Sequence, residues 1–291
     1  MRALMAGILL VTATFVAAAS PLTVCYTNDL HVRLDRLASL SRAIEDVRAT
    51  GDPMVWLDAG DGWHDYRRPL PAVWGSDVMT AWMNETGLAA MALGNHETYL
   101  GPQRLSDRMA EAVFPVLAAN WRSNDPRLAV RSSVTLRVGE ISMQVIGLLT
   151  PEFLPVYAYP LVTVLDPVSV VRNAIDRQDA AVDLVVVLAH VSLDRARRIA
   201  RDVPDIDLFL TGHSHERTEE PIVIGHTIIV QSGAFGEALG RLQLDISDDD
   251  VTVVSHELIP MGTAPADDRA GAVKLLSVVA ALLVAAAVWW F

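Results

Sequence analysis

Residues 22–31 read LTVCYTNDLH, and this stretch decides the fold. Residues 22–27 are rich in β-branched and aromatic side chains, which predicts a strand, and Asn28-Asp29-Leu30-His31 follows directly. Residues two apart in an extended segment point the same way, so Asp29 and His31 are expected to face one metal ion. The sequence therefore predicts a strand that presents metal ligands at its carboxyl end.

The same arrangement recurs at four further places along the chain. Strands are predicted over residues 54–57, 89–93, 184–189 and 206–210, and helices over residues 34–47, 77–86, 168–177 and 193–201. Ligands of open α/β sheets bind outside the carboxyl ends of the strands, so these ends are expected to converge on one crevice. The polar residues that follow the four strands are Asp61, Asn95, His96, His190, His213 and His215.

Strands alternate with helices in the first half of the chain, and hairpins dominate its end. Further strands are predicted over residues 114–118, 134–138 and 141–146, and hairpins turn at residues 139–140, 225–226 and 247–250. This order predicts a layered α/β domain with one large mixed or parallel sheet and a second, more antiparallel sheet. The wholly apolar strands are typical of sheets that are covered on both faces.

The types of these residues favour a transition metal. Imidazole nitrogens mixed with carboxylate and amide oxygens suit Mn, Zn, Fe or Co better than Ca or Mg, which prefer oxygen ligands alone. Asp61 offers two carboxylate oxygens, one for each of two ions, and Gly212 lets the backbone pass close to the site. A single histidine after a strand is more often a hydrogen-bonding residue, but the ordered set of motifs is specific.

The order of these motifs resembles that of the calcineurin-like metallophosphoesterases, in particular the catalytic domain of the 5′-nucleotidase branch. The resemblance extends over about residues 22–260 and implies a four-layer α/β/β/α sandwich of two mixed β-sheets flanked by helices. The segments that carry it are residues 27–31 (TNDLH), 57–61 (LDAGD), 94–97 (GNHE), 212–215 (GHSH), 231–236 (QSGAFG) and 239–241 (LGR).

The resemblance also implies how the ligands are shared between two divalent ions. Asp29, His31 and His215 would hold the first ion, and Asn95, His190 and His213 the second, with Asp61 bridging both. A hydroxide that bridges the ions would attack the phosphorus, and the ions would clamp the oxygens of an in-line displacement. His96 would be the catalytic histidine that meets the substrate, an assistance typically worth ~10²–10⁴-fold in rate.

Two features depart from the resemblance. Tyr99 stands where the nucleotidase branch commonly has an aspartate that orients the catalytic histidine. Residues 62–68 (GWHDYRR) form an unusual segment, which is either a solvated surface loop or a substrate-facing loop. In the second case Arg67 and Arg68 would attract phosphate and Trp63 would offer a stacking face.

Apolar runs lie at both ends of the chain. Residues 3–19 behind Arg2 end in three alanines, which predicts a signal peptide over residues 1–20, with an uncleaved anchor as the alternative. The catalytic domain is expected over residues 21–261 and a linker over residues 262–271, with no second domain of the kind that binds the base in 5′-nucleotidases. Residues 272–291 are nearly uncharged and predict a C-terminal transmembrane anchor, with a buried helix as the alternative.

The charge limits the partners. The net charge is −12, and a nucleic-acid polymer needs a basic face, so a small phosphate ester is the expected partner, besides the membrane. The single cysteine, Cys25, excludes an intramolecular disulfide. The sequence thus predicts an exported dinuclear phosphoesterase on the periplasmic or extracellular face, acting on phosphate mono- or diesters, with nucleotides as one candidate. The alternatives are a thiosulfohydrolase-like enzyme and a tethered metal-binding module without turnover.

Overall fold

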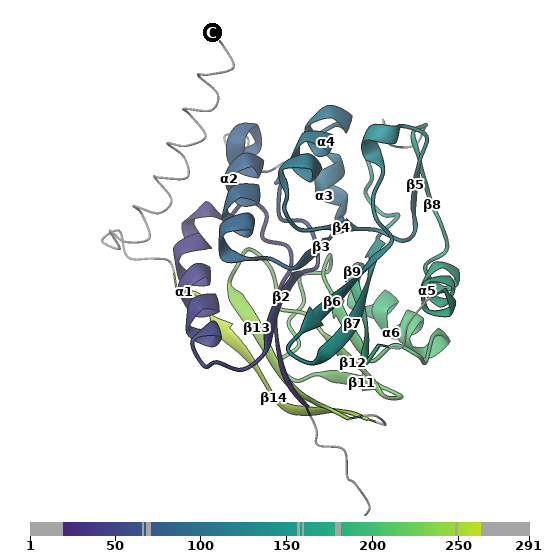
Figure 1. Cartoon of the computed structure of the whole chain (residues 1–291). Coiled ribbons are helices and arrows are strands. Elements are labelled where there is room, and N and C mark those ends of the chain that lie inside the picture. The colour runs from purple at the N-terminus through teal and green to yellow at the C-terminus, as the bar shows by residue number, and fades with distance from the viewer. Residues whose placement is uncertain are drawn as a thin grey trace, which may run out of the picture.

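The computed structural model describes residues 20–65, 67, 71–155, 158, 160–177, 182–247 and 250–262. Two mixed sheets run through this part of the chain, and Figure 1 shows helices on both sides of them. The helices are α1 (Leu37–Arg48), α2 (Pro71–Thr86), the single turn α3 (Asn95–Thr98), α4 (Pro102–Glu111), α5 (Pro167–Asp176) and α6 (Leu193–Asp202), with 3₁₀ turns at Leu34–Arg36 and Pro126–Leu128.

The first sheet has a parallel centre extended by an antiparallel hairpin. Strands β1, β2, β3 and β4 are parallel neighbours, whereas β13 pairs antiparallel with β1 and β14 pairs antiparallel with β13. In spatial order the strands are β14 (Val251–Pro260), β13 (Ala238–Ile246), β1 (Ser20–Thr27), β2 (Met54–Asp58), β3 (Ala90–Ala92) and β4 (Val116–Leu117).

The second sheet is built in the same way. Strands β7, β9, β10 and β12 are parallel neighbours, and β6 and β11 add antiparallel edges. In spatial order the strands are β11 (Ile222–Ile224), β12 (Thr227–Val230), β10 (Leu208–Thr211), β9 (Leu184–His190), β7 (Ile141–Leu149) and β6 (Ser133–Val138). A small antiparallel pair, β5 (Trp121–Ser123) and β8 (Val162–Val164), lies outside both sheets.

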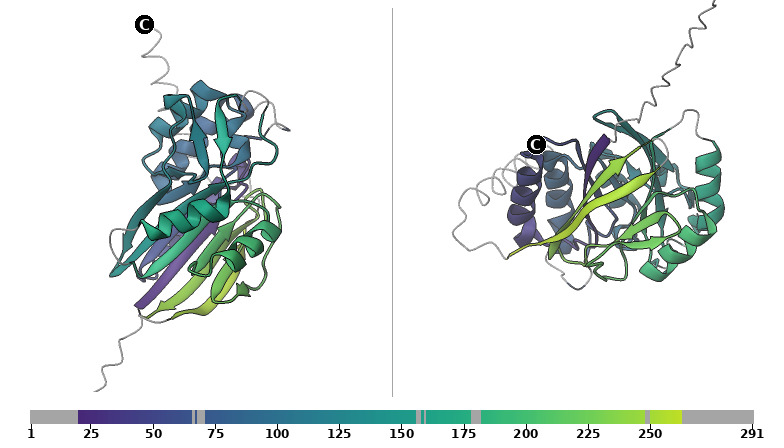
Figure 2. Two further views of the ribbon diagram at one scale, coloured as in Figure 1. Left: turned by 90° about the vertical axis from the view of Figure 1, so that its right-hand side faces the viewer. Right: turned by 90° about the horizontal axis from the view of Figure 1, so that it is seen from below.

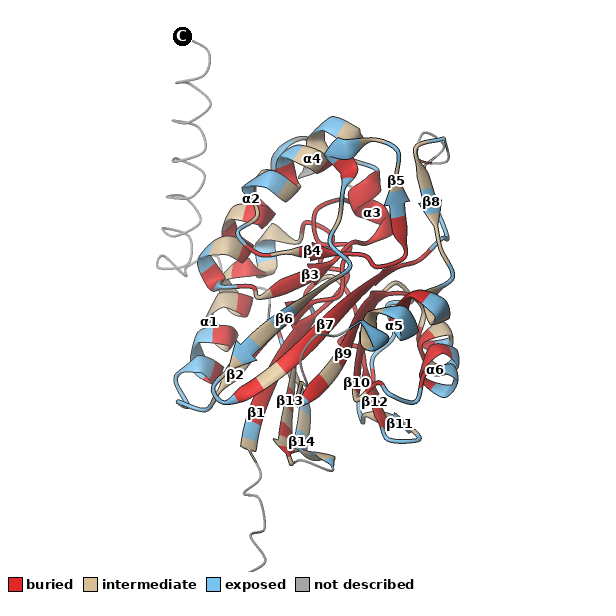
Figure 3. Cartoon of the chain, turned by 45° about the vertical axis from the view of Figure 1, so that its right-hand side comes forward, coloured by how far each residue is buried: buried red, intermediate tan, exposed pale blue. Residues whose placement is uncertain are grey.

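Alternation along the strands divides the core into three apolar layers. Side chains of a strand point to opposite faces in turn, so Cys25 packs toward α1 and α2 while Val24 and Tyr26 pack between the two sheets. On β9, Val187 and Ala189 face α5 and α6. The view from below in Figure 2 shows the two helical layers outside and the strands between them, and Figure 3 shows that these strands are largely buried. This is the α/β/β/α order that the resemblance implies.

The structure corrects several sequence predictions. Both sheets are mixed, as the resemblance implies, but the expectation that the second sheet is more antiparallel than the first is wrong, because the C-terminal hairpin β13–β14 extends the first sheet. Helix α4 and the pair β5–β8 were not predicted, α2 begins six residues earlier than residue 77, and the strand expected at residues 114–118 shrinks to β4.

The ends of the chain bear on the predictions about the membrane. The signal peptide expected over residues 1–20 lies outside the described residues except for Ser20, and so do the linker beyond Gly262 and the anchor expected over residues 272–291. No helix of the described part has both the length and the apolarity to cross a membrane.

Candidate metal centre

The polar turns after the parallel strands of both sheets meet at one place. Asp29 follows β1 and its backbone N–H donates to the Gly60 carbonyl at 2.8 Å, while the His31 N–H donates to the Asp61 carbonyl at 2.9 Å. From the other sheet, the backbone N–H of His213 donates to Asp29 Oδ2 at 2.9 Å. The predicted convergence of strand ends is therefore what the structure shows.

The backbone at this place has an unusual conformation. Asp29, His31, Asp61, His213 and His215 all have positive φ angles, between 47° and 71°. This left-handed region is unfavourable for residues with a Cβ, by roughly 1–2 kcal/mol each, and such strain clusters at functional sites. The pairs Asp29/His31 and His213/His215 thus converge through left-handed turns, and the expectation that Asp29 and His31 lie on extended backbone is wrong.

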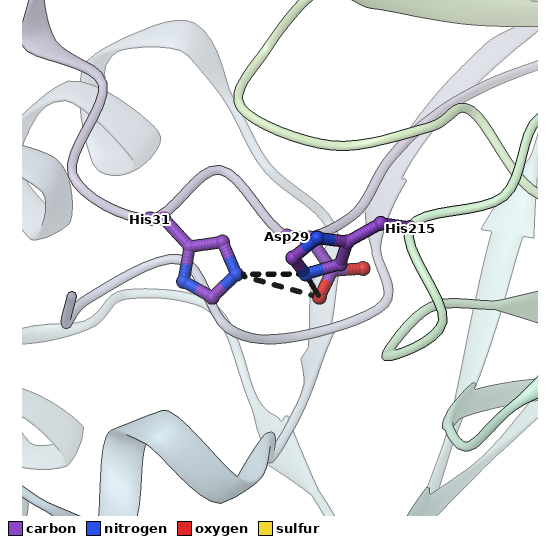
Figure 4. A group of neighbouring side chains, drawn as sticks. All are labelled: Asp29, His31 and His215. Atoms are coloured by element: carbon purple, nitrogen blue, oxygen red, sulfur yellow. Dashed lines mark hydrogen bonds and ion pairs between the residues drawn. The ribbon is translucent and has the colours of Figure 1, made fainter. Parts of the chain in front are cut away.

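Asp29, His31 and His215 form one group of potential ligands (Figure 4). Asp29 Oδ1 lies 3.6 Å from His31 Nε2 and 3.2 Å from His215 Nε2, and the two Nε2 atoms are 3.1 Å apart. Asp29 and His31 are buried, whereas the side chain of His215 is 35% exposed. The three side chains therefore point at a common centre that solvent reaches from the side of His215.

A second group lies next to the first. His190 Nε2 is 3.0 Å from Asp61 Oδ2 and 3.9 Å from Asp29 Oδ1. His213 Nδ1 lies 3.1 Å from Asn95 Oδ1. Asp61 and Asp29 both approach His190, so the two groups are continuous and share their carboxylates.

Backbone carbonyls select which histidine nitrogen faces the centre. His31 Nδ1 is 3.2 Å from the carbonyl of His64, and His190 Nδ1 is 2.8 Å from the carbonyl of Ala59. In a metal-bound form, a proton on each Nδ1 would donate to the carbonyl and leave the Nε2 lone pair for the ion. His213 is turned the other way, because its Nε2 lies 3.4 Å from Glu152 Oε2 while its Nδ1 faces Asn95.

The buried charges are strongly coupled. Burial alone would lower the pKa of His190, but the carboxylates of Asp61 and Asp29 raise it to about 10. Burial likewise opposes ionisation of the two carboxylates, yet the neighbouring histidines hold the pKa of Asp29 well below its usual range and lower the pKa of Asp61 to about 2. Both carboxylates are therefore ionised at neutral pH, and positive charge at the centre stabilises them.

The residues fit a bound metal ion. Asp29 Oδ1 and His190 Nε2 are buried and make no hydrogen bond of regular geometry among the described residues, although each has a charged neighbour at the centre, His215 Nε2 at 3.2 Å and Asp61 Oδ2 at 3.0 Å. Buried polar atoms of native proteins are nearly always satisfied, and a cation between them satisfies both. Three overlapping groups have ligand atoms within 4.8 Å of one another, and their members are Asp29, His31 and His215; His31, Asp61 and His96; and Asp29, Asp61 and His190.

His96 lies at the edge of this centre. Its Nε2 is 3.9 Å from Asp61 Oδ2, and its backbone N–H donates to Asp61 Oδ1 at 2.8 Å. Its ring lies edge-on to His31, 5.9 Å from His64 and 5.7 Å from Tyr99, measured between ring centroids. Burial lowers the pKa of His96 to about 4, so this imidazole is neutral at pH 7.

Tyr99, which stands where the nucleotidase branch commonly has an aspartate, packs beside His96 together with His64. The rings of Tyr99 and His64 stack on each other at 5.9 Å and an interplanar angle of 10°, and both contact the ring of His96. His64, which the sequence did not single out, also supplies the carbonyl that faces His31 Nδ1. Aromatic packing thus surrounds His96 at this position.

The structure treats differently the three residues of the loop after Asp61 that would contact substrate if the loop faced it. Trp63 is 0% exposed and packs near Phe114 in the core, so the prediction that it offers a stacking face is wrong. Arg67 is anchored by Asp65, with Nε 2.9 Å from Oδ1, and lies 5.0 Å over the ring of Phe235, which packs against His31 and His215. Arg68 lies outside the described residues.

Two glutamates shape the centre without having been given a role from sequence. Glu152 approaches His213 and pairs with Arg195 at 3.1 Å, and only the fold brings these residues together. Glu97 belongs to the GNHE motif, and its carboxylate accepts the backbone N–H groups of Asp61, Trp63 and Gly94 at 2.8–2.9 Å. It therefore ties the turn after β2 to the turn after β3.

We expect Glu97→Ala to lower the free energy of unfolding by at least about 3 kcal/mol. The substitution orphans three buried N–H groups, each worth roughly 1–3 kcal/mol. Urea unfolding of the chelator-treated protein measures this without a contribution from metal binding, and Glu85→Ala, at an exposed position of α2, is the control. A loss no larger than that of the control contradicts the role of Glu97 as a tie between the two turns.

Comparisons with known proteins agree with this geometry. The profile of the calcineurin-like phosphoesterases matches residues 22–217. The chain is 29% identical over 297 residues to the trifunctional nucleotide phosphoesterase protein YfkN of Bacillus subtilis, which covers 85% of this chain and 19% of YfkN.

Solved structures share the fold. A 5′-nucleotidase precursor from Thermus thermophilus superposes with a TM-score of 0.77 at 24% identity, covering 91% of this chain and 59% of that one. The sulfate thiohydrolase SoxB of Thermus thermophilus superposes with a TM-score of 0.75 at 20% identity, covering 89% of this chain and 60% of that one. The chain thus spans less than two thirds of each of these three proteins.

These findings confirm the predicted resemblance and the predicted four-layer fold. They also agree with the predicted enzyme class, because the matching profile is that of phosphoesterases. Since the profile covers more than half of its residues, the chain belongs to the calcineurin-like phosphoesterase family.

Proposed function

We propose that the chain is an exported phosphoesterase that hydrolyses phosphate mono- or diesters with two divalent transition-metal ions. The observation that supports this most is the convergence of Asp29, Asp61 and His190 in one buried cluster, from strand ends of two different sheets. A cluster with two ionised carboxylates and unsatisfied ligand atoms suits cations. Export rests on the apolar residues 3–19 alone.

The distances support the following assignment of ligands. Asp29, His31 and His215 would hold the first ion, since their ligand atoms lie within 3.6 Å of one another. Asn95, His190 and His213 would hold the second ion. Asp61 would contribute to both, because its Oδ2 lies 3.0 Å from His190 Nε2 and its carboxylate belongs to one group of potential ligand atoms with His31.

The bound ions would neutralise the phosphoryl oxygens and lower the pKa of a water molecule for in-line attack. The chain's own residues orient the reactants. His96 is neutral at pH 7 and lies beside Asp61, so it hydrogen-bonds to a phosphoryl oxygen or to the leaving-group oxygen. Arg67, fixed by Asp65 over Phe235, adds positive charge on the side of the first ion.

The test is metal analysis combined with a substrate panel on the purified full-length chain. We expect about two transition-metal ions per chain and hydrolysis of p-nitrophenyl phosphate or bis(p-nitrophenyl) phosphate. Nucleotides, sugar phosphates and lipid phosphates then rank the physiological substrates. Bound metal without turnover of any ester would indicate a binding module, and sulfate release from an S-sulfonated thiol would indicate a sulfur enzyme.

Glu152 allows a prediction about the second ion. Partners that orient ligand histidines typically contribute 10–100-fold to metal affinity, so we expect Glu152→Ala to weaken binding of the second ion about tenfold. Activity is measured as a function of added metal, and kcat should return to within about twofold of the wild-type value at saturation. Glu140→Ala, at a 93% exposed side chain on the β6–β7 turn, is the matched control. Equal metal dependence in the two variants would refute this role.

A further inference from the structure

We propose that Phe153 is a specificity-determining residue that stacks on the planar ring of the leaving group. This inference rests on the proposed phosphoesterase function. Phe153 lies in the loop after β7, and its ring centroid is 5.9 Å from that of His213. A bulky apolar side chain beside a proposed metal ligand lies where it could contact the group that is esterified to the phosphate.

Phe153 is presented to solvent rather than packed. Its side chain is 71% exposed, in contrast to Trp63, which is buried in the core. Phe235 also borders the centre, but it packs against the rings of His31 and His215 and lies under Arg67. Phe153 is therefore the large aromatic side chain at the described centre with the most surface available for a ligand.

The backbone holds Phe153 in an unfavourable conformation. Its φ is +56°, a region that bulky residues rarely adopt. Strain of this kind persists where the surroundings enforce it and clusters at binding sites. Here the preceding residue is fixed, because the Glu152 N–H donates to Thr150 Oγ1 at 3.2 Å and the Glu152 carboxylate approaches both His213 and Arg195. The ring therefore has a defined position relative to His213.

The chemistry of the side chain selects its ligand. A neutral phenyl ring offers a π face without hydrogen bonds, which suits a nucleobase or another planar aromatic group better than a sugar. Tyr99, the other aromatic residue with an exposed surface at the centre, already stacks on His64. The expected substrates are thus phosphate esters with a planar ring in the leaving group, nucleoside monophosphates among them.

The experiment compares AMP with ribose 5-phosphate, which carries the same type of ester without the base. We expect Phe153→Ala to lower kcat/KM for AMP about tenfold, mainly through KM, since stacking on an aromatic side chain contributes about that much. The value for ribose 5-phosphate should change by less than about twofold. Phe153→Tyr should retain the preference for AMP.

Two controls separate the ring from its backbone. Phe153→Asn removes the ring but tolerates a positive φ, so it should lose the preference without loss of thermal stability. Val254→Ala removes a 62% exposed apolar side chain from β14 and should leave the preference unchanged. An unchanged AMP to ribose 5-phosphate ratio in both Phe153→Ala and Phe153→Asn overturns the proposal.

The affinities of the metal-loaded protein for AMP and ribose 5-phosphate, measured by calorimetry, test the stacking role without requiring turnover. If the wild-type protein hydrolyses neither these two esters nor the p-nitrophenyl esters, the proposed function fails, yet metal-loaded protein should still bind AMP more tightly than ribose 5-phosphate in a Phe153-dependent manner. If it hydrolyses both esters with a ratio that Phe153 does not influence, the phosphoesterase function stands and the stacking role is refuted.

Discussion

Asp61→Asn is expected to lower kcat/KM for bis(p-nitrophenyl) phosphate by at least about 10³-fold. The asparagine keeps the shape of the side chain, and its Oδ1 can still accept the His96 N–H that Asp61 accepts at 2.8 Å. It removes the negative charge that lies 3.0 Å from His190 and that we assign to both ions. Charge stabilisation by bound metals is worth several kcal/mol, and each 1.36 kcal/mol is a factor of ten in rate.

The matched control is Asp194→Asn on α6. The Asp194 side chain is 77% exposed and pairs only with Arg197 among the contacts that the structure shows, at 2.9 Å. Such surface pairs contribute little to stability, so activity should stay within about twofold of the wild-type value. Metal content by mass spectrometry should fall in Asp61→Asn alone. If this variant kept more than a tenth of the wild-type activity at saturating metal, the bridging role of Asp61 would be refuted.

The sequence predicted that these polar turns meet because its signal is local. A strand that its apolar residues make recognisable in the sequence precedes each of the residues Asp29, Asp61, Asn95, His190 and His213. The carboxyl ends of parallel strands lie at one edge of a sheet, so the turns that follow them are neighbours. Adjacent turns therefore follow from strand order. What spacing could not provide was the conformation, because the left-handed φ angles of Asp29, Asp61 and His213 accompany contacts between turns from different strands.

Side-chain direction in the loops was beyond sequence reasoning. Trp63 lies two residues after Asp61, and nothing local tells whether its ring turns to the site or to the core, where it is in fact buried near Phe114. Glu152 approaches His213 from a loop 61 positions away, which only the packing of β7 beside β9 brings about. Both outcomes depend on tertiary contacts and not on local pattern.

Sheet membership was uncertain for the same reason. The hairpin of β13 and β14 is visible as alternating residues, but its partner could have been either sheet. It pairs with β1, where Gly240 lies opposite Tyr26 and leaves room for the tyrosine ring. Helix α4 escaped prediction because it has few apolar residues, and its buried side chains are Leu105 and Arg108.

Removal of the metal is expected to lower the melting temperature by about 10 °C. A ligand that binds only the folded state stabilises it by about 4 kcal/mol at a thousand times its Kd, and 1 kcal/mol shifts Tm by roughly 2–4 °C in domains of 150–250 residues. The buried carboxylates of Asp29 and Asp61 make this dependence strong, because a cation adds to the compensation of their charge that nearby histidines and two backbone N–H groups provide.

Two histidine variants show whether the chelator acts at this centre. His190→Ala removes a buried proposed ligand and should abolish most of the difference in Tm between metal-loaded and chelator-treated protein. His226→Ala removes a side chain that is 56% exposed on the β11–β12 turn, 3.7 Å from Asp207, and should keep the full difference. Asp61→Asn gives a second reading if His190→Ala does not fold. A difference of equal size in all three variants would place the stabilising metal elsewhere, because each proposed ligand that is lost must reduce the binding free energy available to the fold.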